Sequence, residues 1–141
     1  FGRDDQFAMP AHYEPRPDIG RLLIGTPGIA GIAAVEAAAT LVAEAGIGAI
    51  RAKAVRLTRL ALDLCAEHGL ASPTPQDDRR RGGHVSVRHP EAGRLVEELA
   101  DSGVLADFRR PDLIRLGCSP LTTRYTDVWT AVTTLARLAP G

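Results

Sequence analysis

Apolar and polar positions follow a helical period through the middle of the chain. Between residues 47 and 68, apolar side chains recur at steps of three and four, while most arginines fall on the other side. This spacing is typical of an amphipathic helix with one face in a core. By the same criterion we expect helices over 29–45, 90–102 and 127–138, the first of them dominated by alanine.

Short extended segments separate these helices. The alternation in 84–88 predicts a strand, and 104–108 and 113–117 predict two more, whereas Pro73 weakens a strand over 70–74. The order is two helices, a strand, a helix, two strands and a helix. It indicates an α+β layer, with the helices on one face of a small, mostly antiparallel sheet. We therefore predict that 84–88 and 113–117 share that sheet.

The first residues show no such period and contain several prolines. We accordingly expect an irregular segment over 1–28, followed by the folded part over 29–141. Thr26 is expected to cap the helix that follows, and Pro27 suits its first position. Thr126 is expected to cap the last helix.

Composition excludes several classes of partner. Apolar residues make up 45% and charged residues 24% of the 141, and the formal net charge is zero. This balance is typical of a globular domain and gives no reason to expect nucleic acid or a membrane as partner. The acidic and basic loop at 75–83 is expected to be a solvated surface loop.

The spacing of the cysteines and histidines supports neither a metal site nor a disulfide. Cys65 and Cys118 lie far apart and are expected to be reduced thiols of a cytoplasmic protein. His84 and His89 flank a predicted strand, where surface hydrogen bonding is the expected role, so we predict no metal site. Phosphate-loop, zinc-protease and serine-hydrolase motifs are absent from the sequence.

Arg115 is the most informative charge, because it lies in an otherwise apolar strand. Such an arginine must reach solvent, pair with an internal acid such as Asp107 or Asp112, or face a cleft and bind an anion. Its fork matches a carboxylate, and spacing alone leaves pairing and anion binding equally open. Thr26 has two possible roles, a helix cap or a phosphate ligand, and sequence alone favours the cap.

Several segments in one order resemble the C-terminal part of kynureninases. Gly25-Thr26-Pro27 is similar to that family's glycine-threonine-proline, and the strand ending in His89-Pro90-Glu91 is similar to one that ends in the same three residues. The remaining similar segments are Arg51-Ala52-Lys53 with Leu57-Thr58, Gly103 to Arg109, Ile114 to Gly117, Pro120-Leu121, Thr123 to Tyr125, and Asp127 to Trp129. Arg3, Gly28, Gly83 and Thr122 depart from the family pattern.

The resemblance implies the small C-terminal domain of a fold-type-I pyridoxal-phosphate (PLP) enzyme, leading in from a large domain missing here and belonging to a cytoplasmic homodimer. Such an enzyme hydrolyses the Cβ–Cγ bond of L-kynurenine to anthranilate and L-alanine, in tryptophan catabolism and NAD biosynthesis. By resemblance, Arg115 binds the substrate α-carboxylate, Thr26 contacts the PLP phosphate, and Phe1 lies near the substrate ring. No catalytic residue is expected in this chain.

The sequence contains a single lysine, Lys53. A PLP lysine must be buried beside the cofactor and able to lose its proton, whereas Lys53 lies among arginines on the expected polar side of its helix. We therefore expect the chain to be an inactive part of its parent enzyme. Two alternatives stay open. One is another fold-type-I enzyme, such as a cysteine desulfurase or aminotransferase relative, and the other is a non-catalytic partner-binding domain.

Overall fold

The computed structural model describes residues 2, 3, 5, 7–9 and 11–139. The chain forms two compact units, Phe1–Glu44 and Ala45–Gly141. The first unit contains a short 3-10 helix, η1 (Ile19–Leu22), and most of α1 (Ile29–Ala45), which has the bounds predicted for it. No residue of α1 is buried.

The start of α1 differs from the prediction. The helix begins at Ile29, and the Gly28 carbonyl accepts an N–H from Ile32 at 3.1 Å. Thr26 is therefore not its cap, and Pro27 is not its first residue. Proline disfavours helical backbone at the residue before it, and Thr26 to Gly28 precede the helix without regular secondary structure.

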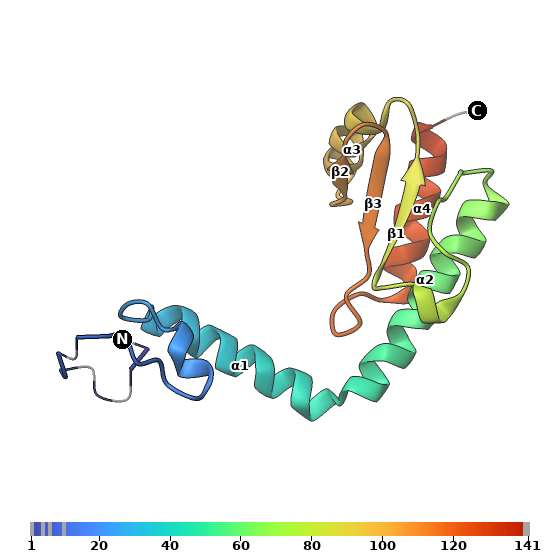
Figure 1. Ribbon diagram of the computed structural model, residues 1–141. Coiled ribbons are helices and arrows are strands. Elements are labelled where there is room, and N and C mark those ends of the chain that lie inside the picture. The colour runs from blue at the N-terminus through green and yellow to red at the C-terminus, as the bar shows by residue number, and fades with distance from the viewer. Residues whose placement is uncertain (1, 4, 6, 10, 140–141) are drawn as a thin grey trace. The chain divides into compact units, whose positions relative to one another are not determined.

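The second unit contains the sheet, whose strands are β1 (His84–Arg88), β2 (Asp107–Arg109) and β3 (Leu113–Gly117). The order is β1-β3-β2 and both pairings are antiparallel (Figure 1). The predicted sharing of one sheet by 84–88 and 113–117 is confirmed. β2 starts later than predicted because Gly103, with φ of +80°, and the bond from Val104 N–H to the Leu99 carbonyl at 2.8 Å close the preceding helix.

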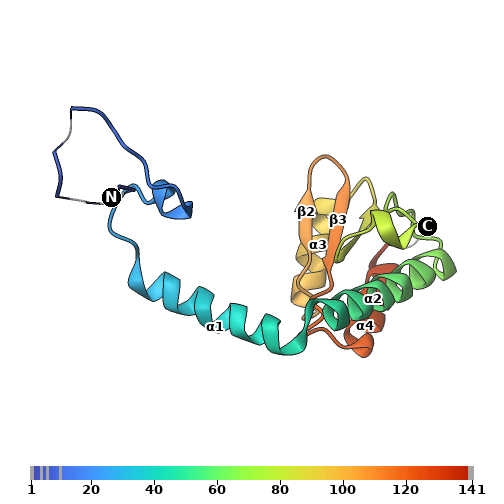
Figure 2. The same cartoon turned by 60° about the horizontal axis from the view of Figure 1, so that its bottom comes forward.

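Three helices complete this unit: α2 (Ile47–Glu67), α3 (Ala92–Asp101) and α4 (Tyr125–Leu138). Strand residues Val85, Val87, Ile114 and Leu116 are buried in one core with side chains from all three helices. Because side chains alternate across a strand, this core lies on one face of the sheet, as predicted (Figures 1 and 2). The core also contains Leu57, Ala61, Leu62, Leu64, Cys65, Ala92, Leu95, Leu99, Cys118, Val128, Val132 and Leu135.

The last helix begins earlier than predicted. α4 starts at Tyr125, and the Asp127 carboxylate accepts the Arg124 N–H at 2.8 Å. An acid at the third helical position therefore satisfies the backbone at the cap, and Thr126 is not the cap.

The segment before β1 runs beside it without forming a strand. The Arg88 N–H donates to the Ala71 carbonyl at 2.7 Å, and the Ser86 N–H donates to Thr74 Oγ1 at 2.8 Å. Ser72 Oγ donates to the Ser86 carbonyl at 2.7 Å. Side-chain hydroxyls thus satisfy the outer edge of β1 near Pro73, which has no N–H to donate.

Among the described residues, no single helix is long and apolar enough to cross a bilayer, and α1 and α2 meet such a criterion only when taken together.

Candidate functional site

Arg115 lies on the face of the sheet opposite the helices. Along β3, Ile114 and Leu116 are buried, whereas Arg115 between them is partly exposed. The strand register places Ser86 of β1 and Asp107 of β2 directly opposite Arg115. These three residues form one row across the open face, with the arginine on the central strand.

The structure gives Arg115 one carboxylate partner. Its Nη2 contacts Asp107 Oδ2, and its side chain keeps 34% of its exposure. The other acid considered from the sequence, Asp112, pairs instead with Arg88, at 3.1 Å from its Nε. The ion-pair alternative is thus present in the folded chain, through one guanidinium nitrogen.

A second arginine shares the same carboxylate oxygen. Arg109 Nε lies 3.0 Å from Asp107 Oδ2, so Asp107 faces two guanidinium groups. One negative charge against two positive charges leaves this part of the face with a formal charge of +1. A further anion would therefore be attracted here.

The single contact leaves donors of Arg115 available. A guanidinium carries five N–H groups, and Nη2 has two of them, one on each of the two forked edges. Asp107 takes one Nη2 hydrogen, so one complete two-donor edge stays open. In the described part of the chain, Arg115 makes no other side-chain hydrogen bond. The guanidinium can therefore bind another carboxylate while it keeps Asp107.

The other two predicted site residues are placed differently. Thr26 is exposed in the first unit, and its side chain makes no hydrogen bond to any described residue. Arg115 lies in the second unit. Phe1 lies outside the described residues. The roles of Thr26 and Phe1 remain predictions.

The single lysine of the sequence, Lys53, is the residue to test for attachment of PLP. Lys53 is half-buried on α2 and lines neither of the two hollows described below. Neither of these two hollows therefore gives Lys53 the enclosed space beside a cofactor ring that a PLP lysine requires. Within the described ranges, no group of three or more histidine, cysteine or acidic residues is placed to hold a metal ion.

The loop at 75–83 is mostly exposed, as predicted, and its Arg79 and Arg81 pair with its own Asp77 and Asp78, but Arg81 is buried. The Arg81 side chain is only 1% exposed. Its Nε donates to Thr58 Oγ1 of α2 at 2.9 Å, its Nη1 to the Pro75 and Gln76 carbonyls at 2.8 and 3.0 Å, and its Nη2 contacts Asp78. The burial of Arg81 was not predicted, because charge alone cannot show that a neighbouring helix offers acceptors to one arginine.

Asp78 joins this network to α2 a second time. Its Oδ1 accepts from Arg59 Nη2 at 2.9 Å as well as from Arg81. Desolvation pushes the pKa of Asp78 upward, but the hydrogen bonds from Arg81 and Arg59 outweigh it and hold that pKa below its ordinary value. The carboxylate therefore remains charged at neutral pH and ties the loop to the helix.

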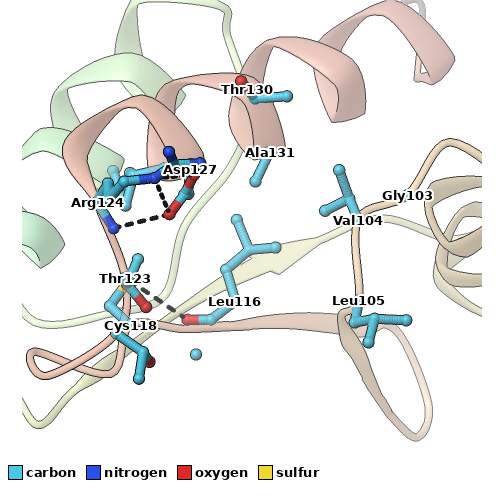
Figure 3. A pocket seen from close by; sticks show the side chains of 14 residues that line it. Gly103, Val104, Leu105, Leu116, Cys118, Thr123, Arg124, Asp127, Thr130 and Ala131 are labelled. Atoms are coloured by element: carbon cyan, nitrogen blue, oxygen red, sulfur yellow. Dashed lines mark hydrogen bonds and ion pairs between the residues drawn. The ribbon is translucent and has the colours of Figure 1, made fainter.

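A cavity of about 520 Å³ lies between α4, β3 and residues 103–105 (Figure 3). Leu116 and Val104 line it, and the Arg124–Asp127 pair borders it. Arg124 holds the pKa of Asp127 below its ordinary value. Leu116 points away from the face that carries Arg115, so this cavity is separate from the row around Arg115.

A smaller hollow of about 200 Å³ adjoins that row. It includes Ser86, the cross-strand neighbour of Arg115, together with His84 and Arg80. Arg115 itself is not among its lining residues. Neither cysteine contributes reactive chemistry: both are free and buried, and burial raises the pKa of Cys65 to about 11 and also raises that of Cys118.

Comparison with known proteins gives a consistent result. The family described as "Kynureninase C-terminal domain" matches residues 50–135. Kynureninase from Pseudomonas fluorescens is 40% identical over 142 residues, covering 98% of this chain and 34% of its own length. Kynureninase from Geobacillus thermodenitrificans is 36% identical over 140 residues, covering 96% and 33%. The chain thus spans about a third of the length of the curated relatives it matches.

Solved structures share the fold at low identity. A cysteine desulfurase from Thermococcus onnurineus, in its apo form, matches with a TM-score of 0.77 and 17% identity, covering 89% of this chain and 35% of the desulfurase. An 8-amino-7-oxononanoate synthase from Francisella tularensis matches at 0.54 and 15%, covering 66% and 28%. These similarities confirm the fold class expected from the sequence.

Proposed function

Because this chain belongs to the kynureninase C-terminal domain family, we propose that it is the C-terminal part of a PLP-dependent hydrolase that converts L-kynurenine to anthranilate and L-alanine. The names of the relatives, at 36–40% identity, support this substrate. Their greater length supports a larger parent protein, in which the PLP lysine and the rest of the cofactor site lie outside the present chain.

The observation that carries the proposal is the open donor edge of Arg115. A bidentate guanidinium–carboxylate pair gives both energy and orientation, and the substrate is an α-amino acid. Arg115 sits on a strand of the sheet, and its neighbours on β3 are fixed in the core. The position of the guanidinium is therefore supported by a rigid element, as binding of a carboxylate in one orientation requires.

The role of this chain is to bind and orient the substrate. PLP, when bound in the full-length enzyme, supplies the electron sink for cleavage of the carbon–carbon bond. Arg115 holds the α-carboxylate, which sets the direction of the rest of the substrate. Thr26 adds a hydroxyl for the cofactor phosphate by the resemblance noted above. The acid–base groups for the reaction come from the remaining two thirds of the enzyme.

We further propose that the enzyme is a cytoplasmic homodimer. The surface of α1 supports a contact with another part of the protein, because Ile29, Ile32 and Val35 are exposed by 79%, 53% and 69%. An apolar surface of this kind is typical of a contact region. Light scattering of the full-length enzyme tests the dimer.

The decisive experiment uses the full-length enzyme with kynurenine and, separately, with cysteine. Anthranilate release from kynurenine is expected. Formation of alanine from cysteine, with the sulfur released as sulfide once dithiothreitol supplies the two electrons, would instead establish the desulfurase alternative. Arg115→Ala is expected to lower kcat/KM for kynurenine by about a hundredfold or more, because two charge-assisted hydrogen bonds are lost. PLP occupancy, read from the absorbance spectrum, is expected to stay unchanged, and an unchanged kcat/KM would make Arg115 a structural residue.

A further inference from the structure

We propose that Asp107 is a positioning residue for substrate binding: it holds the Arg115 guanidinium in place through one nitrogen and leaves a two-donor edge for the α-carboxylate. Arg109 assists by occupying the same oxygen of Asp107. This inference rests on the role proposed above for Arg115 and adds two residues to it.

The strand register supplies the first argument. Asp107 is the direct cross-strand partner of Arg115 on the face of the sheet opposite the helices. Directly opposed side chains on neighbouring strands are close enough to interact. On the other side, the partner is Ser86, whose hydroxyl carries no charge. Asp107 is therefore the only carboxylate in this row of three residues.

A carboxylate partner can hold the guanidinium of an arginine in the orientation that binds a second carboxylate. A free arginine side chain samples many rotamers, and binding of a ligand has to overcome the entropy that is lost when one rotamer is selected. An ion pair that already orders the guanidinium reduces that cost before the substrate arrives. Because Arg115 is 34% exposed, packing alone does not fix its end.

The sharing of Asp107 supplies the second argument. Arg109 Nε lies 3.0 Å from Oδ2, the same oxygen that Arg115 Nη2 contacts. Both arginines thus use Oδ2 of Asp107, and the Arg115 guanidinium makes a single contact with this carboxylate. A carboxylate that served Arg115 alone could take both donors of one edge, which would compete with the substrate.

The test is steady-state kinetics of Asp107→Ala and Asp107→Asn in the full-length enzyme. Asp107→Ala is expected to raise KM for kynurenine about tenfold, with kcat and PLP occupancy changed by less than about twofold, because binding of the carboxylate is weakened uniformly. Asp107→Asn keeps an acceptor oxygen and is expected to raise KM by only about threefold.

Two controls separate positioning from general damage. Kynuramine, which is kynurenine without its α-carboxylate, is used as a competitive inhibitor, and its inhibition constant is expected to be the same in wild type and Asp107→Ala. Asp112→Ala removes the acid that directly precedes β3 and pairs with Arg88, and is expected to leave KM unchanged. In an Arg115→Ala background, Asp107→Ala is expected to have no further effect.

Three results would overturn the inference. A fall in KM on Asp107→Ala would make Asp107 a competitor of the substrate, and an equal weakening of kynuramine would make its role structural. An unchanged KM in both Asp107→Asn and Asp107→Ala would exclude any role of Asp107 in substrate binding. If Asp107→Ala does not fold, the KM of Asp107→Asn alone decides whether Asp107 has this role. If Arg115→Ala itself has no effect, the proposed function fails, and this outcome is measured independently of Asp107.

Discussion

Arg81 and Arg115 are the same residue type in two opposite settings. Arg81 is 1% exposed, and its hydrogen bonds to a hydroxyl, two carbonyls and a carboxylate join the loop at 75–83 to α2. Arg115 is 34% exposed and has one carboxylate contact in the described part of the molecule. A buried arginine that uses four of its five donors within the fold stabilises it, whereas an arginine with an open two-donor edge can bind a ligand.

The largest effect expected from this comparison is on stability at Arg81. Arg81→Ala is expected to lower the free energy of unfolding by about 3 kcal/mol, because the buried acceptors around it lose their donors. Urea denaturation of the chain measures this. Arg79→Ala in the same loop is the matched control, since the Arg79 side chain is 90% exposed. Equal losses for the two variants would contradict the structural role of Arg81.

Arg115 is expected to show the reverse behaviour. Arg115→Lys keeps the charge and loses the fork, so kcat/KM in the full-length enzyme is expected to fall about tenfold to a hundredfold. Arg115→Ala is expected to change the free energy of unfolding of the chain by less than about 1 kcal/mol, as for other partly exposed ion pairs. A larger loss of stability would place Arg115 with Arg81 as a structural arginine.

Acid is expected to weaken the Arg81 region. The pKa of Asp78 is lowered from 3.8 in the folded chain, despite desolvation, by hydrogen bonds from Arg81 and Arg59. Its contribution to stability is therefore present above about pH 3.8 and is lost as the pH falls through the lower folded value. The urea midpoint, measured from pH 6 down to pH 3, should decline less in Asp78→Asn than in wild type. A parallel decline would exclude Asp78 as a source of the acid sensitivity.

The smallest effect is expected for attachment of PLP to Lys53, a residue outside the surroundings of both Arg81 and Arg115. Mixed with PLP and then with borohydride, the chain is expected to carry no PLP on Lys53, because this lysine lines neither hollow. Mass spectrometry after digestion checks this, with Lys53→Arg as the blank. A PLP adduct on Lys53 together with anthranilate release would show that the chain forms a complete site.

The sequence alone determined most of the second unit. The period of the apolar residues predicted the bounds of α2 to within one residue at its end, and the strands β1 and β3 were predicted at their observed bounds. These patterns are local because burial of one face requires them whichever element packs against that face. The apolar context of Arg115 also singled it out as a candidate anion ligand. These features depend on residues close together in the chain, so local pattern was sufficient.

Only the tertiary structure decided which charges are used and which stay available. Three arginines in succession, Arg79 to Arg81, look alike in sequence, and Arg81 is buried because Thr58, 23 residues earlier, offers an acceptor. Asp107 rather than Asp112 pairs with Arg115 because the register of β2 on β3 places it opposite. Such choices depend on contacts between distant segments, and those contacts exist only once the sheet and helices have packed together.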